Sequence, residues 1–164
     1  MIIGKRGFTL IELLIVIALL GSLAVGLLAT VDPFEQLKKG RDTSTRNSAA
    51  EFYNSVIRFY AQRASFPTGL VSGITSGKLG SMNGVISDIA AAGELKADFI
   101  NLAGTGNLNR VYVTIPDTES VTVCFNPESK SFRNDQNTKF DSTGGLATAT
   151  CPAATSPNCY VCFR

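Results

Sequence analysis

Histidine is absent from the 164-residue sequence. Imidazole is the most frequent general base in nucleophilic catalysis, a common metal ligand and the side chain that titrates near neutral pH. Its absence argues against Ser–His and Cys–His catalysis and against metal sites that use histidine. The acidic residues form no paired motif either. The sequence therefore predicts a protein that is not an enzyme and needs no cofactor.

Cysteine is absent from the chain before Cys124, and all four cysteines lie between that residue and Arg164. An even number of clustered cysteines is typical of disulfides in a small exported domain, in an oxidising compartment. The alternative is a zinc site, because Cys159 and Cys162 have CxxC spacing, but the other two cysteines form no second CxxC pair. We therefore expect disulfides and no metal.

Charge is nearly absent from residues 8–31, where Glu12 is the only charged side chain. A helix of these 24 residues is roughly 36 Å long, enough to cross a hydrocarbon core of about 30 Å. A carboxylate at the centre of such a span costs roughly 2.5–3.5 kcal/mol on insertion scales. A simple membrane anchor accounts for the leucines and isoleucines but not for Glu12, so we expect this carboxylate to have a purpose.

A short basic leader, residues 1–7, precedes the apolar run and ends in Gly7. A secretory signal would carry its cleavage site after the apolar core, whereas the candidate cut here, between Gly7 and Phe8, comes before it. The basic leader, the glycine, the phenylalanine and a glutamate at the fifth place after the cut together resemble the type IV pilin family. That family includes the pseudopilins of type II secretion and of DNA-uptake systems.

The resemblance implies that a prepilin peptidase cuts the precursor between Gly7 and Phe8, and that Phe8 is N-methylated. It also implies the partners: other copies of the chain and other pilins in a helical filament, the peptidase, the cytoplasmic membrane and the pilus assembly machinery. In a filament core of low dielectric, an unpaired carboxylate is strongly unfavourable. Pairing Glu12 with the Phe8 amine of a neighbouring subunit would neutralise both charges and set the axial register.

The expected function is that of a structural subunit of a type IV pilus or pilus-like filament. The alternative is a minor pilin or pseudopilin that acts as a binding or priming module for DNA uptake, adhesion or type II secretion, since these subunits share the same N-terminus. The precursor is expected to cross the cytoplasmic membrane once, with its N-terminus in the cytoplasm and its cysteines outside. The assembled filament is expected at the cell surface.

The net charge of the chain does not support a nucleic-acid partner. Without Lys5 and Arg6, thirteen basic residues face thirteen acidic ones. One local basic cluster, Lys38, Lys39 and Arg41, follows the span. Most such clusters are solvated helix faces, and contact with acidic headgroups or with DNA is the alternative.

The chain is predicted to have three parts: a leader (1–7), a transmembrane or filament-core helix (8–31) and a globular head (32–164). The head includes the amphipathic second half of the stem helix, at about 33–64, with Asp32 as its cap and Pro33 in its first turn. Polar i,i+4 pairs are expected at Glu35–Lys39 and Asp42–Arg46. Apolar residues with a period of 3.6 predict one buried stripe: Phe34, Leu37, Ala49, Phe52, Tyr53, Val56, Ile57, Tyr60 and Ala61.

The rest of the head is predicted to consist mainly of short strands and loops. Strands are expected at Val111–Ile115, Val121–Phe125 and Tyr160–Phe163, with a short one around Ser131–Arg133. One or two short helices are expected within Ile86–Lys96, and loops at residues 69–83 and 134–157. The fold class is α+β and pilin-like: a long N-terminal helical stem, membrane-spanning in its first half, packed against a small C-terminal antiparallel sheet.

These strands favour one pairing of the cysteines. Cys159 and Cys162 are an odd number of residues apart, so in an extended strand their side chains point to opposite faces. Cys124 and Cys162 fall in strands that can lie side by side, and Cys151 and Cys159 bracket a short loop. We favour Cys124–Cys162 with Cys151–Cys159, and the other two connectivities stay open.

Overall fold

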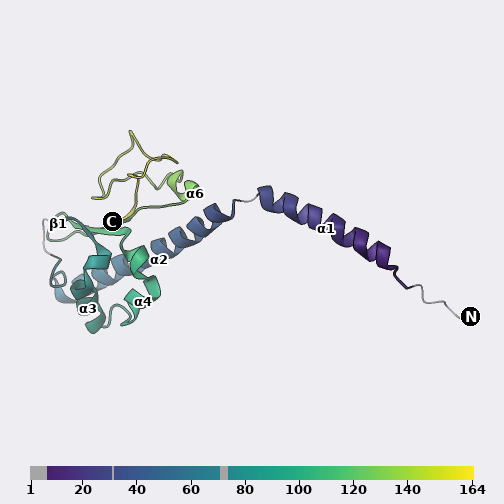
Figure 1. Cartoon of the computed structure of the whole chain (residues 1–164). Coiled ribbons are helices and arrows are strands. Elements are labelled where there is room, and N and C mark those ends of the chain that lie inside the picture. The colour runs from purple at the N-terminus through teal and green to yellow at the C-terminus, as the bar shows by residue number, and fades with distance from the viewer. Residues whose placement is uncertain (1–6, 31, 71–73) are drawn as a thin grey trace, which may run out of the picture. The chain divides into compact units, whose positions relative to one another are not determined.

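The computed structural model describes residues 7–30, 32–70 and 74–164 (Figure 1). The chain divides into two compact units, Met1–Phe34 and Glu35–Arg164. The helices are α1 (Leu10–Thr30), α2 (Pro33–Arg63), α3 (Asn83–Ala91), α4 (Phe99–Ala103), α5 (Thr105–Leu108) and α6 (Lys130–Arg133), with a 3-10 turn, η1, at Leu79–Ser81. The strands are β1 (Ile74–Lys78), β2 (Val111–Ile115), β3 (Thr122–Phe125) and β4 (Val161–Phe163).

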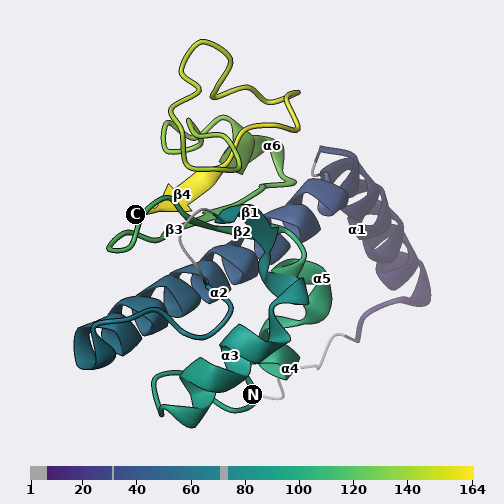
Figure 2. The same ribbon diagram turned by 90° about the vertical axis from the view of Figure 1, so that its left-hand side faces the viewer.

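The architecture confirms the expected α+β, pilin-like fold class. An apolar N-terminal helix is followed by a second long helix, and the four strands form one antiparallel sheet in the order β1-β2-β3-β4. In both overall views α2 runs between α3 and α4 on one side and the C-terminal loops on the other (Figure 1, Figure 2).

Helix α1 is apolar on every side. Residues Leu10–Leu28 are long and apolar enough to cross a membrane, and 0% of this segment is buried within the described structure. Leucine and isoleucine side chains all around a helix are typical of a buried or membrane-spanning helix. By length and composition, α1 is therefore a candidate membrane span.

Helix α2 starts at a cap and buries one face from its tenth residue onward. The Asp32 Oδ1 atom accepts a hydrogen bond from the Phe34 backbone N–H (3.1 Å), and Pro33 occupies the first helical position, as expected. The first buried residue is Asp42. The buried face then reads Asp42, Thr45, Ser48, Ala49, Phe52, Ser55, Val56 and Phe59.

The predicted apolar stripe of α2 is only partly correct. Phe34 and Leu37 are 72% and 65% exposed, and Ile57 is 41% exposed. The helical period continues through Phe34 and Leu37, but the first buried residue of α2 is Asp42. The predicted i,i+4 pairs are also wrong, because Glu35 pairs with Lys38 and Asp42 pairs with Arg110.

The sheet lies between α2 and a C-terminal cover. Alternation along β2 turns Val111, Val113 and Ile115 to one face, where all three are fully buried in the same hydrophobic cluster as Phe52 of α2. Strand β3 continues this face, since Val123 pairs directly with Val113. The core of the head therefore includes the layer between the sheet and the buried face of α2, and buried residues of α3, α4 and α5 such as Ile89, Phe99 and Leu108 belong to the same cluster.

The opposite face of the sheet is covered by the loop that follows α6. A Cβ atom on Gly144 would lie 2.5 Å from the Thr122 Cγ2 atom, and Gly144 has a φ of +88°. Only glycine fits this close approach without strain. The Tyr160 ring packs edge-on against Tyr112 at a centroid distance of 5.4 Å. These contacts explain why Thr122 is buried although it faces away from α2.

Several short elements differ from the sequence prediction. The segment 69–83 was expected to be a loop, yet it contains β1 and η1, and β1 pairs with β2 (Lys78 with Tyr112). A strand around Ser131–Arg133 was expected, but these residues form α6. Ser129 caps that helix, because its hydroxyl accepts a hydrogen bond from the Phe132 N–H.

Two disulfides join Cys124 to Cys162 and Cys151 to Cys159, the pairs that the strand geometry favours. Cys124 and Cys162 occupy paired positions on β3 and β4. This bridge closes a sequence separation of 38 residues. In the chain-entropy estimate a loop of that size stabilises the head by roughly 3–4 kcal/mol.

We predict that Phe52→Ala lowers the free energy of unfolding of the head by about 3–5 kcal/mol, because the fully buried ring leaves a cavity against the sheet. Ile57→Ala on the same helix is the control, and it should cost less than about half as much because Ile57 is 41% exposed. Urea unfolding of the detergent-solubilised chain, followed by circular dichroism, measures both. Equal losses would contradict the placement of the core on the Phe52 face.

Candidate processing and assembly site

The residues around the candidate cut precede the first helix. Gly7, Phe8 and Thr9 lie outside regular secondary structure and are exposed, and α1 begins at Leu10. The Phe8 side chain is 81% exposed. The leader residues 1–6 lie outside the described residues. The Gly7–Phe8 peptide bond is therefore in a non-helical, accessible segment.

Thr9 and Glu12 form a reciprocal cap at the start of α1. The Thr9 backbone N–H donates to the Glu12 Oε2 atom (2.8 Å), and the Glu12 N–H donates to the Thr9 Oγ1 atom (3.3 Å). The Thr9 hydroxyl also donates to Glu12 Oε2 (2.6 Å). This is a capping box, in which a threonine and a glutamate three residues later satisfy two otherwise unpaired N–H groups of the helix start.

The cap occupies only one of the two oxygens of Glu12. The Thr9 N–H and hydroxyl both bind Oε2 of this carboxylate, and Oε1 has no hydrogen-bond partner among the described residues. An ionised carboxylate accepts up to about four hydrogen bonds. Glu12 is thus fixed in position by Thr9 and keeps one oxygen free for a cation.

The residues predicted from the sequence for processing and assembly lie together within about one helical turn: Gly7, Phe8 and Glu12. The four predicted cysteines are in the head and take no part in this site. Thr9 was not predicted. Its signal is present in the sequence, because Thr9-Leu-Ile-Glu12 is the Thr-x-x-Glu pattern of a capping box at the start of an apolar run.

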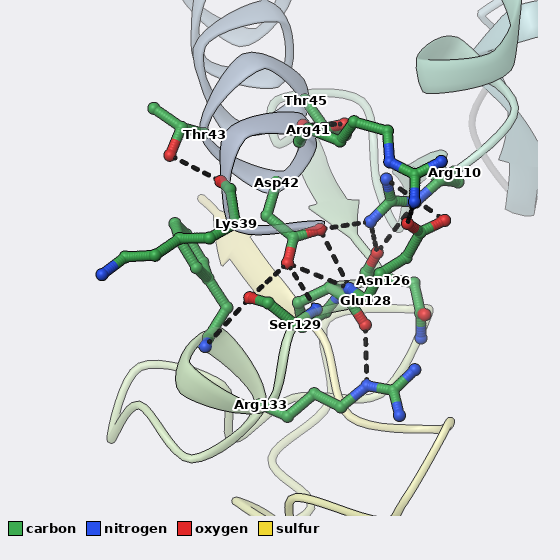
Figure 3. A network of polar contacts seen from close by, with 12 residues as sticks. Lys39, Arg41, Asp42, Thr43, Thr45, Arg110, Asn126, Glu128, Ser129 and Arg133 are labelled. Carbon is green, nitrogen blue, oxygen red and sulfur yellow. Dashed lines mark hydrogen bonds and ion pairs between the residues drawn. The ribbon is translucent and has the colours of Figure 1, made fainter. Parts of the chain in front are cut away.

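A second polar cluster lies in the head and is centred on Asp42 (Figure 3). The Asp42 carboxylate is 0% exposed and forms an ion pair with Arg110. It also accepts hydrogen bonds from the backbone N–H groups of Glu128 (2.9 Å) and Ser129 (2.7 Å) and from the Ser129 hydroxyl (2.7 Å). Burying a carboxylate is unfavourable unless an ion pair and several hydrogen bonds replace its water. Asp42 therefore fastens the segment after β3 to α2.

Glu35 binds the next residue of the same segment. Its Oε2 atom accepts the Lys130 backbone N–H (2.9 Å), and its Oε1 atom pairs with the Lys38 ammonium (2.9 Å). The hydrogen bond from Lys130, followed by that from Lys38, lowers the pKa of the Glu35 carboxyl. Glu35 and Asp42, two helical turns apart on α2, together hold residues 128–130.

Four acidic residues lie in the loops of the head, where carboxylates can in principle bind calcium: Asp117, Glu119, Asp135 and Asp141. In the structure, the Asp117 and Asp141 carboxylates accept hydrogen bonds from backbone N–H groups within their own loops. Within the ranges that the structure describes, no group of three or more His, Cys, Asp or Glu side chains is placed to hold a metal ion.

The fold and the N-terminal site define a class of protein: a small α+β head that follows an apolar helix with a capped glutamate at its start. Comparison with known families agrees with this class. A family model described as the prokaryotic N-terminal methylation motif matches residues 3–28, and this motif is the signature of type IV pilin and pseudopilin precursors. No curated protein and no solved structure matches the chain.

The motif supports a precursor of the pilin or pseudopilin kind. It implies a substrate of a prepilin peptidase and assembly into filaments, and the proteins that share it have structural roles. Together with α1, it fits a membrane-anchored precursor.

We predict that Asp42→Ala lowers the free energy of unfolding by about 3–5 kcal/mol, because it leaves Arg110 and two backbone N–H groups without their buried partner. Glu51→Ala, on the exposed face of the same helix, should stay within about 0.5 kcal/mol of the wild type. Urea unfolding of the detergent-solubilised chain measures both. A loss at Asp42 no larger than at Glu51 would contradict the anchoring role.

Proposed function

We propose that this chain is a structural subunit of a type IV pilus or pilus-like filament, made as a membrane precursor and cut after Gly7. The observation that carries the proposal is Glu12: a carboxylate held by a cap, with one oxygen free, at the start of an apolar helix that the described chain does not cover. The cap accounts for the position of Glu12, but a membrane anchor alone makes no use of its free oxygen.

Cleavage would place a new charge close to Glu12. The cut converts the Phe8 peptide nitrogen into an amine, directly before Thr9, whose own N–H binds Glu12. The exposed, non-helical backbone from Gly7 to Thr9 is accessible to a peptidase. Methylation of the Phe8 nitrogen leaves it positively charged at neutral pH, so the modified amine keeps its attraction for a carboxylate.

Assembly would replace the lipid around α1 with the α1 helices of other subunits. In that dry environment both the Phe8 ammonium and the Glu12 carboxylate need a partner. The free Oε1 atom of Glu12 would accept the Phe8 ammonium of a neighbouring subunit, while Oε2 stays on Thr9. The pairing is thus compatible with the cap and fixes the axial position of one subunit relative to the next.

The proposal is tested by three variants of the site that separate charge from capping. Glu12→Gln keeps an acceptor for the Thr9 N–H but removes the charge, Thr9→Ala removes the cap hydroxyl but keeps the charge, and Glu12→Val removes both charge and acceptor. We predict that each variant inserts into the membrane as the wild type does. Filament yield should fall more than about tenfold in both Glu12 variants, because the Phe8 ammonium is left unpaired in the core.

Thr9→Ala should reduce filament yield less than either Glu12 variant, since capping is worth only about 0.5–2 kcal/mol. Quantitative immunoblots of sheared filaments and of membrane fractions measure yield and insertion side by side. Normal filament yield in Glu12→Gln would contradict the ion pair as the assembly contact.

A further inference from the structure

The fold adds a fourth cation to the basic cluster at the start of α2. Lys130 is 92 residues after Lys38 in the sequence, yet its backbone N–H lies 2.9 Å from the Glu35 Oε2 atom, while the Lys38 ammonium lies 2.9 Å from Oε1 of the same carboxylate. Lys38, Lys39, Arg41 and Lys130 therefore gather around the first turns of α2. We call these four residues the basic patch.

The acidic residues beside the patch are already engaged. Glu35 binds Lys38 and the Lys130 N–H, and Asp42 is buried on Arg110. Glu128 pairs with Arg41 (3.0 Å) and lies 3.6 Å from the nearest Arg110 nitrogen. These carboxylates are held within the protein by these partners, and of the two remaining ammonium groups of the patch, that of Lys130 also acts on Glu35.

Two ammonium groups of the patch remain available. The side chains of Lys39 and Lys130 are exposed, and neither forms an ion pair within the described part of the chain. Figure 3 shows the Lys39 side chain extending away from the Asp42 network. The patch therefore presents two free lysines next to the partly exposed Lys38 and Arg41.

Chain connectivity keeps the patch near the membrane. The apolar span ends at Leu28, ten residues before Lys38. Ten residues reach at most about 36 Å when fully extended and about 15 Å when helical. The headgroup layer adds several ångströms to each side of the hydrocarbon core. In a precursor whose α1 spans the bilayer, the patch is thus tethered beside lipid phosphates.

We propose that the basic patch binds the phosphate groups of anionic phospholipids in the membrane that α1 spans. Basic residues next to a membrane span are attracted to anionic lipid surfaces by about 1 kcal/mol each, equivalent to about a fivefold preference per residue. The proposal rests on α1 spanning the membrane and not on filament formation. Its consequence is that the head of the precursor is held against the surface by Lys39 and Lys130.

Nucleic acid is the less favoured ligand for the same cations. On the patch's side of the span, residues 32–164 carry thirteen basic and twelve acidic side chains, so no strong long-range field concentrates a free polyanion at the patch. Lipid phosphates need no such field, because the span already holds them within reach.

The test measures the reactivity of individual lysines in the full-length precursor reconstituted into vesicles. A water-soluble acetylating reagent modifies exposed amines, and mass spectrometry gives the rate at Lys39, Lys130 and Lys96. Lys96 is the internal control. It is exposed, and the Arg58–Glu94 ion pair (2.7 Å) ties its loop to α2 some 20 residues beyond Lys38, about 30 Å along the helix.

The proposal predicts that the rates at Lys39 and Lys130, relative to Lys96, fall about fivefold when phosphatidylglycerol is added to phosphatidylcholine vesicles. At about 1 M salt, where the Debye length is near 3 Å, the protection should disappear. Unchanged relative rates would overturn the proposal. So would protection by duplex DNA in phosphatidylcholine vesicles without protection by phosphatidylglycerol, which would assign the patch to nucleic acid.

Discussion

The uncovered apolar surface of α1 is the constraint on which the rest of the structure depends. None of Leu10–Leu28 is buried within the described structure, and a surface of this kind is strongly unfavourable in water. It needs lipid in the precursor and, in the proposed filament, other copies of the same helix. The head therefore has to fold without help from α1. Every residue of its hydrophobic cluster lies between Ala49 and Val161, outside α1.

The head meets this requirement by using α2 for two different purposes. From Ala49 to Phe59 the helix supplies the apolar wall against which the sheet packs. Nearer its start, Glu35 and Asp42 bind residues 128–130 by charge-assisted hydrogen bonds. The disulfide Cys124–Cys162 attaches β4, near the C-terminus, to β3. The C-terminal part of the chain is thus held near its start, at residues 128–130, and near its end, at Cys162. The same arrangement brings Lys130 into the basic patch, so the stability of the head and its charged surface depend on the same contacts.

The strongly periodic parts of the fold could be predicted from the sequence, whereas most features that depend on contacts between distant residues could not. The apolar run, the cap at Asp32 and strand β2 at Val111–Ile115 could be predicted, because composition, turn chemistry and alternation are local signals. Strand β1 was missed because Ile74-Thr-Ser-Gly-Lys has no alternation of its own and is held by pairing with β2. Ser131–Arg133 alternates like a strand, yet the Ser129 cap makes it helical. Asp42 can occupy a buried position because its partners, Arg110, Glu128 and Ser129, come from distant parts of the chain.

In the candidate site, too, only features with a local sequence signal could be predicted. Gly7, Phe8 and Glu12 could be identified from sequence, since their spacing along one chain is the signal, and the capping threonine was readable from the same pattern. The group that completes the proposed site, the main-chain amine of Phe8, would belong to another copy and would exist only after cleavage. No single chain contains that geometry.

In the proposed function, α1 leaves the lipid and becomes the buried part of a filament after the leader is removed. Intact-mass analysis of the subunit from sheared filaments, compared with that from membranes, is the sharpest test. We expect the filament subunit to lack Met1–Gly7, with about 14 Da added for a methyl group on Phe8, and the uncut precursor to be found in the membrane fraction alone. Filaments built from subunits that still carry Met1 would contradict the proposed function.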